Sequence, residues 1–249
     1  MWNTPANGNG NGKPHTNGNG SAADLAAVAA AIARATHDDA GDAHVLTGFE
    51  TPLRPDAFVM DDELKIELIA DHFRQIMHIL GLDLTDDSLA GTPNRVAKMY
   101  VQEIFKGLNP KNKPGVTLFE NRYAYSEMLV ERDITLYSHC EHHFVPIIGK
   151  AHVAYYSSGK VVGLSKINRI VQYYAKRPQV QERLTVQIGE ELKRSLGTDD
   201  VAVLIDAAHL CVSSRGINDT SSSTVTHFYS GKFEQEAVRM QFINAVKGL

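Results

Sequence analysis

The sequence has little of what marks exported, membrane-spanning or nucleic-acid-binding proteins. It holds only two cysteines, Cys140 and Cys211, and its start lacks the continuous apolar stretch of a secretory signal. No apolar run approaches the roughly 20 residues that a membrane-spanning helix needs. The net charge is −4, which argues against a general nucleic-acid-binding protein. We therefore expect a cytoplasmic protein with reduced thiols that binds no membrane and no nucleic acid.

The first fifty residues also have few of the large apolar side chains that a packed core needs. Residues 1–21 are rich in Asn and Gly, and the Ala-rich stretch after them offers only small side chains. We predict that residues 1–50 form a flexible extension. The remaining residues, 51–249, are enough for one domain with a proper core.

Two helices are expected in the first part of this domain. Residues 61–80 place apolar side chains at the spacing of one helix face, and Gly81 is a plausible stop. The segment GTPNRVAKMYVQEIFKGL predicts a second helix, with Thr92 as the N-cap, Pro93 at the first helical position and Gly107 at the end.

From Met128 onward the apolar pattern changes to that of strands. MLVERDITLYS predicts one strand, and IIGKAHVAYYSSGKVVGL predicts a β-hairpin that turns at Ser157-Ser158-Gly159. Two helices come next, the first capped by Ser165 and the second after Pro178. VAVLIDAAHLCV and residues 222–229 predict two further strands, and a final helix starts at Glu234. Strands interrupted by a helix pair predict an α+β domain around an antiparallel sheet.

Both cysteines lie beside histidines, in SHCEHHF and in HLC. Cys140 and His143 have a spacing that a tight turn can bring to one ion, and Cys211 would share a strand face with His209. Cys140, His143 and Cys211 form a Cys₂His set that suits Zn²⁺ and leaves a fourth position open, as in catalytic sites. His142 and His209 remain for proton transfer, because an imidazole titrates near neutral pH.

Three other interpretations of these segments stay open on the residues alone. The two cysteines could form a disulfide or be merely buried, since lone cysteines often pack as small hydrophobes. Cys140 could be a nucleophile paired with a histidine, although no papain-like signature surrounds it. A surface histidine cluster would not explain two separate Cys/His segments.

Three long motifs carry a family resemblance. SHCEHH, GLSKINRIVQYYAKRPQVQERLT and IDAAHLCVSSRGI resemble GTP cyclohydrolase I, particularly its bacterial form, and the likeness runs from about Asp61 to the C-terminus. The resemblance implies a tunnelling (T-fold) domain, with a helical part at about 55–115 and a T-fold part at about 120–249. It also implies conversion of GTP and water into formate and 7,8-dihydroneopterin triphosphate, the first step towards folate or tetrahydrobiopterin.

The resemblance assigns roles to individual residues. The zinc ligands of the family fall on Cys140, His143 and Cys211, its proton-transferring histidines on His142 and His209, and its sugar-rearranging serine on Ser165. Residues implied in substrate binding are Leu164, Val180, Gln181 and Glu182 for the base pocket, Lys166, Arg169 and Arg215 for the triphosphate, and Arg95 and Lys98 from a neighbouring subunit. No G-x-x-x-x-G-K-[ST] motif occurs, so the phosphates would be held without a P-loop.

The family also implies a homo-oligomer, a toroidal decamer of two pentamers. His139 departs from the small or apolar residue expected before the first cysteine, so an altered local hydrogen-bond network is expected there. Two rival classes are a metal-binding module without catalysis and a T-fold relative with a cysteine nucleophile. Both are disfavoured, because His142, His209 and Glu182 are all present and both cysteines are taken by zinc. A base deaminase would need an H-x-E…P-C-x-x-C signature, which is absent.

Overall fold

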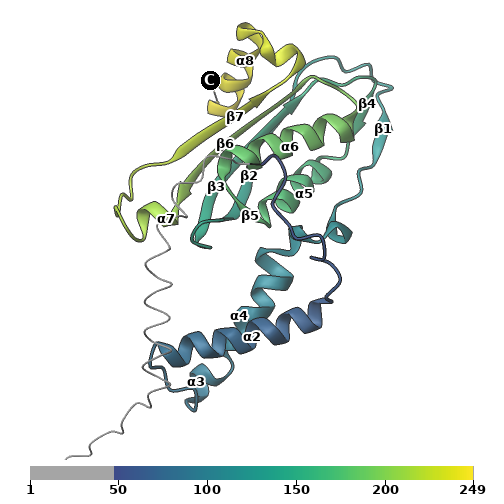
Figure 1. Ribbon diagram of the computed structural model, residues 1–249. Helices are drawn as coiled ribbons and strands as arrows, with labels where there is room; N and C mark the ends of the chain where they lie inside the picture. Colours follow the sequence, from purple (N-terminus) through teal and green to yellow (C-terminus); the bar gives the residue numbers. More distant parts are fainter. Residues whose placement is uncertain (1–47, 249) are drawn as a thin grey trace, which may run out of the picture. The chain divides into compact units, whose positions relative to one another are not determined.

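The computed structural model describes residues 48–248 (Figure 1). The predicted extension, residues 1–50, therefore lies almost wholly outside the described residues. Within them, no helix has the length and apolar character needed to cross a membrane.

One long helix and several short ones occupy the first part of the described chain. They are α2 (Asp62–Ile79), α3 (Asp87–Ala90), α4 (Thr92–Lys98), the π-helix η2 (Met99–Ile104) and the 3₁₀ turns η3 (Lys106–Leu108) and η4 (Pro110–Asn112). The Asp61 carboxylate caps α2 by accepting from the Leu64 N–H at 2.8 Å. The second predicted helix differs at its start, because Gly91 is the N-cap and the Thr92 hydroxyl accepts from Arg95 Nη2 instead.

The second part holds a five-stranded sheet of order β5-β2-β3-β6-β7. Its strands are β2 (Leu129–Cys140), β3 (Pro146–Tyr155), β5 (Pro178–Gln179), β6 (Val201–His209) and β7 (Thr224–Tyr229). All neighbours are antiparallel except the short β5, which runs parallel to β2. The α+β prediction with an antiparallel sheet is confirmed.

Two long helices and the C-terminal helix cover the sheet (Figure 1). α5 (Leu164–Ala175) packs on β2, and α6 (Gln181–Leu196) packs on β6 and β7. Val203 and Ile205 of β6 belong to the main core, whereas the alternate residues Ala202 and Leu204 join a second cluster with Phe242. Because Phe242 lies on α8 (Glu236–Lys247), this helix covers part of the second face, whereas Tyr137, Ile148 and Val225 on that face stay exposed.

The hairpin predicted at Ser157-Ser158-Gly159 is wrong. β3 ends at Tyr155, and β4 (Lys160–Val162) pairs with β1 (Leu118–Glu120) in a separate two-stranded sheet. The reason is that β3 already has β2 on one edge and β6 on the other, so no edge is left for β4. The hairpin in the structure joins β2 to β3.

Two local predictions near the site are also corrected. Ser165 is not the cap of α5, because the helix begins at Leu164 and Gly163 stands at the N-cap without a side-chain bond. Cys211 does not share a strand with His209, because β6 ends at His209 and Cys211 lies in the one-turn helix α7 (Leu210–Ser213).

Candidate metal and substrate site

A tight turn after β2 carries two of the predicted metal ligands. The Cys140 N–H donates to Val145 O at 2.9 Å, and the Phe144 N–H donates to Cys140 O at 2.8 Å. Phe144 has a φ of 54°, a left-handed conformation that reverses the chain within five residues. His143 is thereby returned towards Cys140. We call residues 140–145 the metal loop.

The third predicted ligand reaches the metal loop through the sheet. Ile147, near the start of β3, pairs with His209 at the end of β6, so α7 begins beside the metal loop. Ligand atoms of Cys140, His143 and Cys211 all lie within 4.8 Å of one another. Both thiols are free, so the disulfide alternative does not hold in this structure. Burial, followed by the neighbouring Cys140 thiol, raises the pKa of Cys211.

The three residues fit a metal ion by their chemistry. Two thiolates and one imidazole are the borderline-soft donors that Zn²⁺ takes, and three protein ligands leave a fourth tetrahedral position. Arg215 Nη1 lies 2.9 Å from His143 Nε2. Since a guanidinium can only donate, this imidazole nitrogen is an unprotonated acceptor. A metal ion bound at this nitrogen would take the same lone pair and replace the contact with Arg215.

His209 is held beside the metal loop by Gln181. The Gln181 Nε2 donates to Ile205 O at 3.2 Å and Thr224 O at 2.8 Å, which fixes the amide orientation, because the reverse would set oxygen against two carbonyls. Gln181 Oε1 therefore faces His209 Nε2 at 2.7 Å as an acceptor, and that ring nitrogen must carry the proton. Burial lowers the pKa of His209, and the Glu182 carboxylate opposes that shift.

The other predicted histidine lies in the metal loop itself. His142 Nδ1 is 3.8 Å from Cys140 Sγ. Its ring and that of His143 meet edge to face, with centroids 6.5 Å apart. The structure thus places His142 beside Cys140, and it places His209 at the end of β6, two residues before Cys211.

His139, whose presence was unexpected, is buried next to the metal loop. Its ring packs against Phe105 at a centroid distance of 5.6 Å, and its Nδ1 has no hydrogen-bond partner among the described residues. Burial, followed by the charge of Lys176, lowers the pKa of His139.

The predicted base-pocket residues gather at two helix starts. Val180 is the N-cap of α6, and Gln181 and Glu182 are its first two residues; Gln181 is buried and Glu182 is exposed. Leu164 and Ser165 are the first two residues of α5, and Ser165 is exposed while Leu164 is 49% exposed. The Gln181 side chain makes close contacts with Ile205, Thr224 and His209 in the structure.

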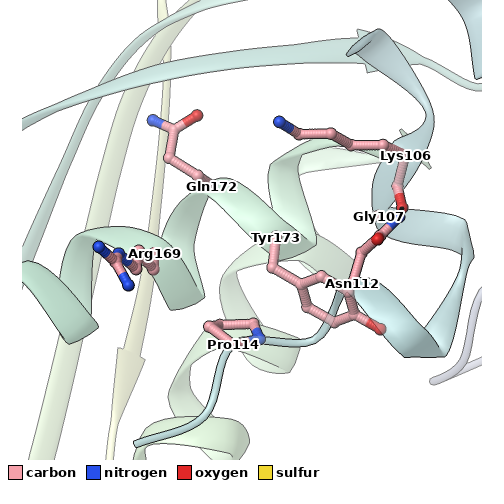
Figure 2. A pocket seen from close by; sticks show the side chains of 7 residues that line it. All are labelled: Lys106, Gly107, Asn112, Pro114, Arg169, Gln172 and Tyr173. Carbon is pink, nitrogen blue, oxygen red and sulfur yellow. Dashed lines mark hydrogen bonds between the residues drawn. The ribbon is translucent and has the colours of Figure 1, made fainter. Parts of the chain in front are cut away.

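Of the predicted phosphate-binding residues, Arg215 reaches the metal loop and two others lie on α5. These two are Lys166 and Arg169. Arg169 lines a cavity of about 320 Å³ together with Gln172 and Lys106. Figure 2 shows Arg169 and Gln172 projecting from α5, and Lys106 from the segment that includes η3.

Arg95 and Lys98 lie on α4, outside this grouping. The Arg95 guanidinium is engaged within its own segment, where Nη2 donates to Ser88 O at 2.9 Å and to Thr92 Oγ1 at 2.7 Å. This placement is compatible with the prediction that these two residues serve a neighbouring subunit.

Sequence relatives match nearly all of the described chain. The sequence model of the GTP cyclohydrolase I family matches residues 69–247. GTP cyclohydrolase 1 of Flavobacterium johnsoniae is 60% identical over 210 residues, which cover 84% of this chain and 94% of the relative. GTP cyclohydrolase 1 of Salmonella arizonae is 56% identical over 207 residues, which cover 83% of this chain and 93% of the relative.

The chain belongs to the GTP cyclohydrolase I family. The predicted resemblance is confirmed, and with it the prediction of an enzyme, at the level of the family. A solved structure, the archaeosine synthase QueF-Like in its apo form, aligns with 42% of this chain and 92% of its own at 19% identity. Its TM-score of 0.34 is too low to bear on fold or function.

Two residues of the site were not singled out from the sequence. Glu141 stands inside the SHCEHHF motif, and Arg183 stands inside QVQERL. In the structure they form an ion pair that joins the metal loop to α6. The only sequence signal for these two residues was their position inside motifs of the site. That signal is weak, because a charged residue in a loop or on a helix is more often solvated.

Proposed function

We propose that this protein is a zinc-dependent GTP cyclohydrolase I that converts GTP and water into formate and 7,8-dihydroneopterin triphosphate. The observation that carries the proposal is the convergence of Cys140, His143 and Cys211 within 4.8 Å in a member of this family. These three residues would hold the ion. Zinc bound there supplies the Lewis acidity that activates water for attack on C8 of the purine.

The surrounding residues fit the proton transfers of the reaction. C8 becomes electrophilic when N7 is protonated; His142 lies beside Cys140, and His209 ends β6 two residues before Cys211. His209 carries its proton on Nε2 and directs it at Gln181, so this histidine is oriented before substrate arrives. Ring opening, a second hydrolysis that releases formate, an Amadori-type rearrangement of the ribose and closure of the pterin ring, which returns one water, complete the sequence. We assign the rearrangement to Ser165.

Substrate recognition is assigned to two helix starts. The Glu182 carboxylate can accept from the N1 and N2 donors of guanine, and it lies close enough to His209 to affect its pKa. Val180, Gln181 and Leu164 would complete the base pocket. Lys166 and Arg169 lie one turn apart on α5, and with Arg215 they would bind the triphosphate.

We further propose that the enzyme is a homo-oligomer, a decamer of two pentamers, to which Arg95 and Lys98 contribute across a subunit contact. Large apolar side chains remain exposed along α2, where Ile76 is 49% and Leu80 is 70% exposed. Both belong to the apolar side chains of residues 61–80 that have the spacing of one helix face. A second subunit would cover such a surface. Residues 51–249 would form the catalytic domain, and a cytoplasmic location stays a prediction.

The test is formate release from GTP, measured with zinc content on the same purified sample. Formate in proportion to bound zinc, with a fluorescent pterin after oxidation, is the expected result. Zinc without formate would reject the activity and leave a binding module.

Two variants separate the ligand from the proton donor. Cys211→Ser should lose both zinc and turnover, because one of three ligands is gone. His209→Ala should retain most of the zinc and lose turnover. Stoichiometric zinc in Cys211→Ser would show that the ligand assignment is wrong.

A further inference from the structure

An ion pair joins the metal loop to α6. Glu141 follows the ligand Cys140, yet its side chain is only 20% exposed and contacts Arg183 Nη2 of α6. The Arg183 side chain is 5% exposed. A buried guanidinium is costly to desolvate unless its donors are satisfied, so the geometry of its partners decides what it does.

Arg183 is fixed by partners on the segment that precedes α6. Its Nε donates to Gln179 Oε1 at 3.1 Å, and Nη2 also donates to Pro178 O at 3.3 Å. The backbone of the metal loop joins the same segment, where the Glu141 N–H donates to Gln179 O at 3.0 Å. Gln179 is itself held, because its Nε2 donates to Tyr174 O at 3.0 Å and to Gln187 Oε1 at 2.9 Å.

We propose that the Glu141–Arg183 pair is a positioning device that holds the metal loop in register with the first turn of α6. This inference rests on the proposed metal site. α6 carries Gln181 and Glu182 at its start and Arg183 directly after them. The pair thus ties Cys140 and His143 to the helix that orients His209 and reads the base. Neither Glu141 nor Arg183 needs to touch substrate.

The physical effect is preorganisation. The metal loop reverses direction through a left-handed residue, and it has to keep two ligands about one ion. Without the pair, the metal loop would be less ordered before zinc binds. Part of the free energy of zinc binding would then be used to order the loop, and the measured affinity would fall. Supporting contacts of this kind typically change metal affinity by about 10- to 100-fold.

A matched control exists on the same helix. Glu191 is buried on α6 and accepts from Lys113 Nζ at 2.8 Å, Arg194 Nη2 at 2.9 Å and Tyr174 Oη at 3.0 Å. Its charge and burial resemble those of the Glu141–Arg183 pair, and none of its three partners belongs to the metal loop, although Tyr174 O also accepts from Gln179. Glu191→Gln therefore reports what the loss of a buried ion pair does to the fold alone.

The experiment measures zinc affinity of the full-length protein by competition with a chromogenic chelator, and thermal unfolding with and without zinc. The variants are Glu141→Gln, Arg183→Met, the double variant and Glu191→Gln. We expect each of the two single variants at the pair to weaken zinc binding about 10- to 100-fold. The double variant should bind zinc at least as tightly as the single variant with the lower zinc affinity, because the two single substitutions remove the same ion pair.

The sign of the Arg183→Met effect separates positioning from simple electrostatics. Loss of a positive charge near the ion would strengthen zinc binding if long-range charge alone mattered. Positioning predicts that it weakens. Tighter zinc binding in Arg183→Met, or wild-type affinity in both single variants, would overturn the proposal. So would an equal loss in Glu191→Gln, which would indicate general destabilisation.

The positioning proposal can still be tested if a variant does not fold or if the wild type shows no activity. If Arg183→Met does not fold, Arg183→Lys keeps the charge but not the planar fork, and it should still weaken zinc binding. If wild type binds zinc but releases no formate, the proposed activity fails, whereas the zinc affinities of the variants still decide this inference. Wild type that binds no zinc would overturn the metal site and this inference together.

Discussion

Replacing Gln181 by leucine should disable His209 without touching a metal ligand. Gln181 is 1% exposed, and its Oε1 accepts from His209 Nε2 at 2.7 Å. Leucine has nearly the same volume but cannot accept, so the imidazole loses the bond that fixes its tautomer and orientation. The variant removes this bond together with the Gln181 Nε2 bonds to Ile205 O, Thr224 O and Thr226 Oγ1, and leaves Cys140, His143 and Cys211 in place.

The activity of Gln181→Leu should lie between the activities of wild type and of His209→Ala. General acid–base catalysis contributes roughly 10²–10⁴-fold, and His209→Ala should lose this factor if His209 is the proton donor. Gln181→Leu keeps the imidazole, so we expect a smaller loss in kcat, of about 10- to 100-fold.

The expected loss of stability follows from the same contacts. Unpaired buried groups cost about 1–3 kcal/mol. For a domain of this size that corresponds to a fall in Tm of about 2 to 12 °C.

Formate release at saturating zinc, zinc content and Tm should be measured on Gln181→Leu and on Thr226→Val. The control removes the Thr226 hydroxyl, which lies 3.1 Å from Gln181 Nε2 and 2.6 Å from Thr185 Oγ1, but spares the bond to His209. It should lose stability and keep kcat. Wild-type kcat in Gln181→Leu, or an equal loss of kcat in Thr226→Val, would refute the role given to Gln181.

Three other variants test separate parts of the molecule. Glu182→Gln should lower kcat/KM for GTP by about 10- to 100-fold, because charge-assisted bonds to the base are lost, and should narrow the preference for GTP over ITP; an unchanged preference would contradict the assignment. His152 accepts from the Asp133 N–H at 3.2 Å, and burial lowers its pKa despite Asp133 and Asp206. The stability that neutral His152 contributes is therefore present above the ordinary pKa of about 6.5 and is lost as pH falls below it. Between pH 7.5 and 5.5, the urea midpoint should drop less in His152→Gln than in wild type. Equal drops in the two proteins would refute this. Gly189→Ala would set a Cβ 2.3 Å from Phe228 Cδ1 and should cost about 1–3 kcal/mol in unfolding free energy, whereas Gly115→Ala, with nothing within 4 Å, should be neutral by the same measurement.

Much of the architecture was predictable because local signals and burial agree. α2 begins at an aspartate that caps it, and α6 keeps Leu184, Ile188 and Leu192 fully buried at helical spacing. The hairpin at Ser157-Ser158-Gly159 failed for a different reason. A turn sequence indicates that the chain reverses, but not which strand edge is free to pair with the next strand, and both edges of β3 are occupied.

The site shows the same division between local pattern and tertiary contact. The Cys-x-x-His spacing and the two Cys/His segments were enough to select Cys140, His143 and Cys211. The strand geometry expected for Cys211 was nevertheless wrong, because it lies on a helical turn and not on a strand beside His209. What brings it to the metal loop is the pairing of β3 with β6, which sets Ile147 opposite His209.

The sequence by itself determined the donor types, their spacing and the order of elements, because these depend on neighbouring residues and on side-chain chemistry. Only the tertiary structure decided that Gln181 fixes the proton of His209 and that Arg183 binds Glu141 of the metal loop. Those contacts join residues 28 and 42 positions apart in the chain. A charged or amide side chain carries no local mark of its distant partner, and folding alone determines whether water or that partner satisfies it.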